Sequence, residues 1–207
     1  MHARSDDGAP RLVLFLPGAA GAAEFWHPVG RLLPQEWAKI YMSWPGLGNE
    51  PHDPRVRGFD DLVALTADRL GPSTDLVAQS MGGIVAVRVA LRHPERVRRL
   101  VLVATSGGVD VTGLGAADWR EDYIREFPSA APWIVRDRPD HTTEIRRIAA
   151  PTLLFWGDQD PLSPIAVGEH LASLLPDSTL ISIGGGAHDL AVERAAEVAP
   201  LIEAHLR

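Results

Sequence analysis

The sequence contains no cysteine. This absence excludes a disulfide bond, a thiolate nucleophile and any metal site built on cysteine sulfur. Lysine and arginine (20 together) are outnumbered by aspartate and glutamate (27), which gives a net charge of −7. We therefore expect neither a broad nucleic-acid-binding surface nor attraction to an anionic membrane, and favour a small-molecule substrate.

Motifs for metals and nucleotides are also missing. The eight histidines show no H-E-x-x-H pattern or other metal-ligand spacing, so we expect no metal site. The glycine-rich stretches at 18–21 and 184–186 match neither G-x-G-x-x-G nor a phosphate-binding loop. We accordingly expect no bound cofactor.

The apolar stretch at Leu12–Ala23 is too short to cross a bilayer and is interrupted by Pro17 and Gly18. It resembles the core of a signal peptide, but Asp6 and Asp7 precede it where a signal peptide is basic. We expect a buried strand followed by a glycine-bearing loop, with His27 as a polar loop cap. A cytoplasmic location follows from this interpretation.

Apolar runs of strand length alternate with longer segments of helical period, which predicts a parallel sheet with helices on both faces. The fold class expected is α/β, a three-layer α/β/α sandwich with a mostly or wholly parallel sheet of about six strands. Residues 1–207 are expected to form a single domain. The predicted strands are Leu12–Leu16, Ala38–Met42, Thr74–Ala78, Arg99–Ala104, Thr152–Trp156 and Thr179–Ile183.

Four helices are predicted between or after these strands. Proline follows two of them, at Pro94 and Pro176, where it stops the helical pattern. The predicted helices are Phe59–Leu70, Met81–Arg92, Ile165–Leu175 and Ala191–Leu206.

The segment 107–148 breaks the alternation, because it has no buried strand and is rich in aromatic residues. Trp119, Tyr123 and Phe127 are spaced four apart and therefore share one helix face; Trp133 follows. The face could line a substrate pocket beneath a short helical lid, or could simply pack the inserted helix onto the domain. The two interpretations are compatible, and we take Trp119, Tyr123 and Phe127 as candidate substrate-binding residues.

Ser80 lies where a predicted buried strand turns sharply into a helix, within the stretch "LVAQSMGGIVAV". A strand–turn–helix with small residues two before and two after a serine is the nucleophile-elbow arrangement. Ala78 and Gly82 are those small residues. A serine hydroxyl needs a base to take its proton and an acid to orient that base.

Two later loops carry the complementary side chains. "TLLFWGDQDPLSP" places Asp158 and Asp160 after one predicted strand, and "TLISIGGGAHDL" places His188 after the last. The carboxyl ends of parallel strands share one edge of the sheet, where such folds bind ligands. Ser80, a carboxylate and His188 are therefore expected to meet there as a catalytic triad.

The motifs "LVLFLPGAAG", "LVAQSMGG", "PTLLFWGDQDPLSP" and "GGGAHDL" together resemble the α/β-hydrolase fold superfamily, specifically its small esterase-like and peroxidase-like members. The resemblance implies that the acid is the last residue of a G-x-x-D loop, which is Asp160. Asp158 is then a loop carboxylate. It also implies an oxyanion hole formed by the backbone N–H groups of Met81 and Ala19.

The sequence departs from the family pattern in two places. Pro17-Gly18-Ala19 stands where the family usually has His-Gly, and Ser43 stands where an aspartate often precedes a Pro-Gly-x-Gly turn. Two further departures are that the usual first two strands have no counterpart before Arg11 and that the lid is short, so we expect a trimmed sheet of about six strands.

The predicted function is hydrolysis of a small, hydrophobic carboxylic ester through an acyl-enzyme. One alternative is cleavage of a carbon–carbon bond, or perhydrolysis, by the same triad. Another is a non-enzymatic ligand-binding or signalling protein on this scaffold. A cluster of Arg92, Arg96, Arg98 and Arg99 is read as a solvated face, with docking of an acyl-carrier protein as its alternative. The sequence does not indicate an oligomeric state.

Overall fold

The computed structural model describes residues 10–207; His2, Asp6 and Asp7 lie outside them. Within this range one sheet contains the strands β1 (Leu12–Leu16), β2 (Ala38–Tyr41), β3 (Thr74–Gln79), β4 (Val97–Val103), β5 (Thr152–Gly157) and β6 (Ser178–Ile183). Their order is β2-β1-β3-β4-β5-β6, and all neighbours run parallel. The predicted parallel α/β sandwich is confirmed, and the strand ends agree with the prediction to within two residues.

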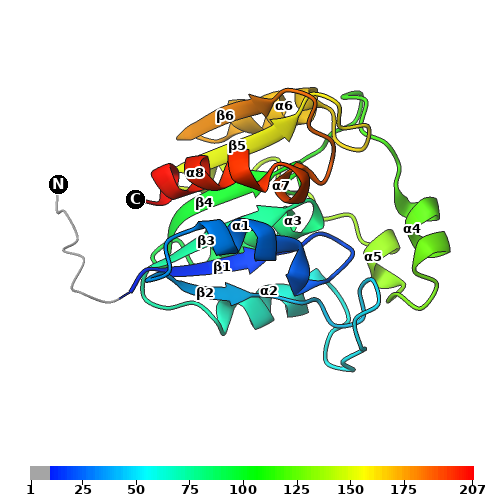
Figure 1. The fold of residues 1–207 in the computed structure, drawn as a ribbon. Coiled ribbons are helices and arrows are strands. Elements are labelled where there is room, and N and C mark those ends of the chain that lie inside the picture. Colours follow the sequence, from blue (N-terminus) through cyan, green and yellow to red (C-terminus); the bar gives the residue numbers. More distant parts are fainter. Residues whose placement is uncertain (1–9) are drawn as a thin grey trace.

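Helices cover both faces of the sheet (Figure 1). On one face lie α1 (His27–Leu32), α7 (Leu190–Glu193) and α8 (Ala195–Leu206); on the other lie α2 (Phe59–Ala67), α3 (Met81–Arg92) and α6 (Ile165–Leu174). Successive side chains of a strand point to opposite faces. Val13 and Phe15 of β1 accordingly join the core under the first layer, whereas Leu14 and Leu16 join the second. Burial on both faces explains why inner strands such as β1 and β5 are continuous apolar runs, whereas the edge strands β2 and β6 are only partly buried.

The inserted segment lies beyond the carboxyl ends of the strands. Its helices α4 (Arg120–Glu126) and α5 (Trp133–Arg136) stand past the arrowheads of the sheet, at the end opposite to the C-terminus (Figure 1). A short turn of 3-10 helix, η2 (Ile145–Arg147), leads back into β5. The insertion is thus placed at the edge where parallel sheets bind their ligands.

Two expectations about local structure were wrong. The loop predicted after β1 contains a 3-10 turn, η1 (Ala23–Trp26), and then α1, which has proline in its first turn. His27 is therefore the first residue of a helix, and its ring meets the Tyr41 ring edge-on at 4.8 Å between centroids. The predicted single last helix is divided at Arg194, whose backbone (φ −118°, ψ 30°) is not helical. This break lets α7 and α8 both pack against α1.

Among residues 10–207, no helix has the length and apolar character needed to cross a membrane.

Candidate active site

Ser80 occupies the turn between β3 and α3 in a strained backbone conformation. Its φ of 51° and ψ of −124° are rarely adopted by a residue with a side chain, and such strain costs about 1–3 kcal/mol. The turn needs glycine at position 82, because a Cβ there would lie 2.3 Å from the Pro17 carbonyl oxygen. The result is a serine held at the amino end of a 12-residue helix, where aligned backbone N–H groups favour negative charge.

The side chains of Ser80, His188 and Asp160 form a continuous hydrogen-bonded row. His188 Nε2 lies 3.0 Å from Ser80 Oγ, and His188 Nδ1 lies 2.8 Å from Asp160 Oδ2. With the imidazole neutral, Nδ1–H donates to the carboxylate, and Nε2 is left free to accept the serine proton. Three residues that are far apart in the sequence therefore meet with the spacing that proton transfer requires.

The carboxylate of Asp160 is buried and fully oriented. Its Oδ1 accepts the N–H groups of Leu162 (2.8 Å) and Ser163 (3.0 Å), which leaves Oδ2 for His188. Asp158 does something different: its Oδ1 accepts the N–H of Gly185 (2.7 Å), in the loop that leads to His188. The two aspartates of the G-x-x-D loop therefore differ in task, and Asp160 is the one beside the imidazole.

The loop after β1 passes directly beside the serine. A Cβ placed on Gly18 would lie 3.2 Å from Ser80 Cβ and 2.4 Å from Gln79 Oε1, so this loop lies in close contact with the turn that carries the serine. Ala19 follows in this loop, and Met81 follows Ser80 as the first residue of α3. The two residues predicted as oxyanion donors thus follow Gly18 and Ser80 in the sequence, one in the loop after β1 and the other in α3.

Sequence reasoning missed several side chains that support this arrangement. Thr105, just after β4, donates its hydroxyl to the Ser80 carbonyl oxygen (2.5 Å), and Gln79 Nε2 donates to the His188 carbonyl oxygen (3.4 Å). The indole N–H groups of Trp26 and Trp44 donate to the carbonyl oxygens of Leu16 and Pro17. Except for Gln79, which immediately precedes the serine, no motif marks these residues, because their roles depend on contacts distant in the sequence.

The predicted substrate-binding aromatic residues lie along α4 and its two ends. The ring centroids of Trp119 and Tyr123 are 5.5 Å apart, and those of Tyr123 and Phe127 are 5.1 Å apart. Tyr123 is buried, and burial raises the pKa of its phenol above the usual 10. Trp133 stands apart from this row, since it lies in α5 and packs against Phe59 of α2. The three rings therefore pack against one another, and Tyr123 joins the core.

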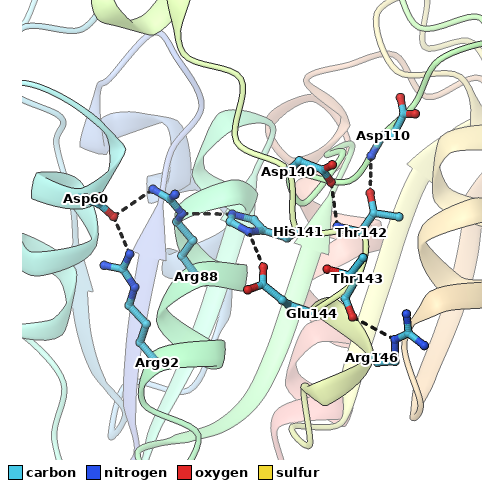
Figure 2. A network of polar contacts seen from close by, with 10 residues as sticks. All are labelled: Asp60, Arg88, Arg92, Asp110, Asp140, His141, Thr142, Thr143, Glu144 and Arg146. Carbon is cyan, nitrogen blue, oxygen red and sulfur yellow. Dashed lines mark hydrogen bonds and ion pairs between the residues drawn. The ribbon is translucent and has the colours of Figure 1, made fainter.

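A charged network connects the carboxyl-terminal part of the segment 107–148 to α2 and α3 (Figure 2). His141 Nε2 accepts a hydrogen bond from Arg88 Nε of α3 (3.1 Å), and Arg88 and Arg92 both donate to Asp60 Oδ1 of α2. Burial, together with the neighbouring Arg88 cation, lowers the pKa of His141 below 6.5. A polar cleft beside this network is lined by residues such as Arg57, Arg88 and Asp137, and by no member of the Ser80 row.

Among the residues that the structure describes, no three histidine, aspartate or glutamate side chains are grouped as metal ligands.

Comparison with known proteins shows the family and the fold of this chain. The family model described as "alpha/beta hydrolase fold" matches residues 11–136 and 119–195. The chain is 28% identical to a pimeloyl-[acyl-carrier protein] methyl ester esterase of Neisseria meningitidis serogroup B, over 75% of this chain and 77% of that protein. It is also 28% identical to a 2-hydroxymuconate semialdehyde hydrolase of Pseudomonas putida, over 90% of this chain and 81% of that protein.

Among solved structures, a thermophilic esterase from Thermogutta terrifontis superposes with a TM-score of 0.77 at 24% identity. The match covers 97% of this chain and 90% of the esterase. At this level of identity the likeness concerns the fold.

Proposed function

Because this chain belongs to the α/β-hydrolase fold family and is a hydrolytic enzyme, we propose that it cleaves a small carboxylic ester through an acyl-serine intermediate. The observation that carries the proposal is the row Ser80 Oγ–His188 Nε2 (3.0 Å) and His188 Nδ1–Asp160 Oδ2 (2.8 Å). Such a row converts an unreactive hydroxyl into a nucleophile, which a ligand-binding protein on the same scaffold does not need.

In the first half of the reaction, Ser80 Oγ attacks the ester carbonyl while His188 Nε2 takes its proton. Asp160 holds the imidazole in the required tautomer and stabilises the imidazolium that forms. The N–H groups of Met81 and Ala19 stabilise the negative oxygen of the tetrahedral intermediate, and each well-placed donor contributes about 3 kcal/mol. His188 then gives its proton to the departing alcohol, which leaves the acyl group on Ser80.

The second half repeats these steps with water. His188 removes a proton from a water molecule, which attacks the acyl-serine carbonyl, and the second tetrahedral intermediate uses the same two donors. Collapse of this intermediate returns the proton to Ser80 and releases the carboxylic acid. The reaction uses the side chains of the chain itself and one water molecule.

A hydrophobic part of the substrate is favoured by the aromatic row at α4. Trp119 and Phe127 are only partly buried, so they offer apolar surface at the two ends of α4 to which such a group could bind. One relative is named for an ester carried by an acyl-carrier protein, and carrier-linked esters are therefore part of the substrate test.

The arginine cluster is a poor docking site for that carrier. Arg96 donates to the carbonyl oxygens of Leu70 and Gly71, and Arg98 pairs with the buried Asp75. Both arginines lie at the amino end of β4, the opposite edge of the sheet from Ser80.

Carbon–carbon bond hydrolysis is the second candidate, supported by the identity to the Pseudomonas hydrolase. It would use the same serine, base and oxyanion hole, and perhydrolysis would do so as well. The substrate screen below separates these reactions.

The test is a screen of aryl esters of increasing acyl length, thioesters, carrier-linked methyl esters and a ring-fission diketone. We expect the highest kcat/KM on a short to medium aryl ester and a loss of at least about 10⁴-fold in Ser80→Ala. Ser173→Ala is the matched control, because this hydroxyl lies on α6 and bonds its own helix. Full activity in Ser80→Ala would rule out the mechanism, and preference for the diketone would select the second candidate.

A further inference from the structure

The loop from Leu16 to Ala19 has each of its four carbonyl oxygens held by a separate donor. Trp26 Nε1 donates to Leu16 (2.9 Å), Trp44 Nε1 to Pro17 (2.8 Å) and Gly21 N–H to Gly18 (3.1 Å). The fourth bond, to the Ala19 carbonyl oxygen, comes from the hydroxyl of Tyr123 (2.8 Å). Three of the donors belong to the sheet domain, and the fourth belongs to lid helix α4.

The two hydrogen-bond partners of Tyr123 determine which atom donates and which accepts in each bond. Its oxygen lies 2.9 Å from Gly48 N, which can only donate, and 2.8 Å from the Ala19 carbonyl oxygen, which can only accept. The phenol must therefore accept from Gly48 and donate to Ala19. Gly48 also lies in close contact with this loop. Its φ is 56°, and a Cβ there would lie 1.9 Å from the Ala20 carbonyl oxygen.

These contacts bear on the N–H group of Ala19. That N–H belongs to the peptide plane whose carbonyl, on Gly18, is bonded by Gly21, and the following plane is bonded by Tyr123. With both planes held, the direction of the N–H is set before substrate arrives, which is the condition for effective oxyanion stabilisation. Without the phenol, the second plane loses its restraint from the lid.

We propose that Tyr123 is a positioning residue, which couples the seating of lid helix α4 to the alignment of the Ala19 oxyanion donor. The inference rests on the proposed function, since it assumes that Ala19 N–H stabilises the oxyanion. It assigns Tyr123 a role different from the predicted one of lining the substrate pocket. Its buried phenol, whose pKa is raised, stays protonated and able to donate in neutral solution.

The first experiment compares Tyr123→Phe with the unmodified full-length chain on an aryl ester. Complete misplacement of one oxyanion donor costs about 10²–10³-fold in kcat, so loosening one of its restraints is expected to lower kcat about tenfold. KM should change less than about twofold, because ground-state binding does not use the oxyanion hole. An aryl boronic acid, which forms a tetrahedral adduct on the serine, should bind more weakly by the same factor as kcat.

Tyr41→Phe is the matched control, because the chain has two tyrosines and Tyr41 lies on β2, stacked on Phe15. This variant should keep the kcat, KM and boronate affinity of the unmodified chain. An unchanged kcat in Tyr123→Phe would overturn the inference. So would a raised KM with unchanged boronate affinity, which would make Tyr123 a pocket-lining residue. Activity retained in Ser80→Ala would instead overturn the proposed function.

A second measurement keeps the hydroxyl group of Tyr123 and changes only the pH at which it ionises. Biosynthetic fluorotyrosine in the Tyr41→Phe background labels Tyr123 alone, and its phenol ionises at lower pH than that of tyrosine. The phenolate can still accept from Gly48 but can no longer donate to Ala19. We expect kcat to fall at alkaline pH in the labelled protein and not in unlabelled Tyr41→Phe. Identical pH profiles of kcat would contradict the coupling.

Discussion

The loops at the strand ends and the lid insertion are held in different ways. Asp160 is oriented by N–H groups two and three residues away, and Ser80 by the turn that begins α3. The segment 107–148 instead packs several side chains into the core and makes polar contacts far apart in the sequence, such as Tyr123 with Ala19 and His141 with Arg88. Local backbone geometry thus orients much of the Ser80 and Asp160 side chains, whereas the segment 107–148 is held by packing and polar contacts between residues far apart in the sequence.

The largest effect is expected in the strand-end loop that carries Asp158 and Asp160. We expect Asp160→Asn to lower kcat about 10⁴-fold, because an amide cannot stabilise the imidazolium and favours the wrong histidine tautomer. The asparagine oxygen can still accept from Leu162 and Ser163, so the loop should keep its shape. Steady-state kinetics on an aryl ester, with circular dichroism as a check on folding, measure this effect.

Asp158→Asn is the matched control in the same loop. Its carboxylate accepts the Gly185 N–H, and an asparagine oxygen can replace it. We expect kcat within about threefold of the unmodified enzyme, since the change replaces a charged acceptor with a neutral one. If Asp158→Asn were the more damaging of the two, the assignment of the acid would have to be reversed.

A smaller effect is expected at the lid attachment around His141. Its pKa is lowered by burial, and also by Arg88, whose Nε–H donates to His141 Nε2. Below a pH of about 6.5 the unfolded chain therefore binds a proton more readily than the folded one, and the free energy of unfolding falls as the pH decreases. Denaturant unfolding at about pH 7.5 and about pH 5.5 measures this loss.

The His141→Gln variant isolates that contribution. A glutamine does not titrate, so the free energy of unfolding should depend less on pH than in the unmodified chain. Some dependence should remain, because burial also lowers the pKa of His205 in α8. An equal or steeper dependence in the variant would show that His141 is not a source of the acid sensitivity.

The sequence was most informative where local rules decide the structure. Strands buried on both faces are continuous apolar runs, so β1 was predicted with its observed ends. The limits of α3 were likewise observed as predicted, because the Ser80 elbow starts the helix and His93-Pro94 ends it. The same rules placed Ser80, the loop with Asp158 and Asp160, and His188 at one edge of the sheet, and the family resemblance selected Asp160. The structure brings the side chains of Ser80, Asp160 and His188 within hydrogen-bonding distance.

Prediction failed where the structure depends on distant contacts or on short elements. Helix α1 has six residues with proline and glycine among them, so its pattern does not differ from that of a loop. The hydroxyl of Tyr123 donates to the carbonyl oxygen of Ala19, 104 residues away, and no sequence pattern predicts that bond. The sequence pattern likewise does not indicate that the indoles of Trp26 and Trp44 bind the loop beside the serine.

The most direct test of the account is covalent labelling of the full-length chain with a fluorophosphonate, followed by mass spectrometry of the peptides. We predict one phosphonylated residue, Ser80, and loss of rapid labelling in His188→Ala, because the hydroxyl then has no base. Labelling at another serine, or an unchanged labelling rate at Ser80 in His188→Ala, would contradict the claim that these side chains form one catalytic unit.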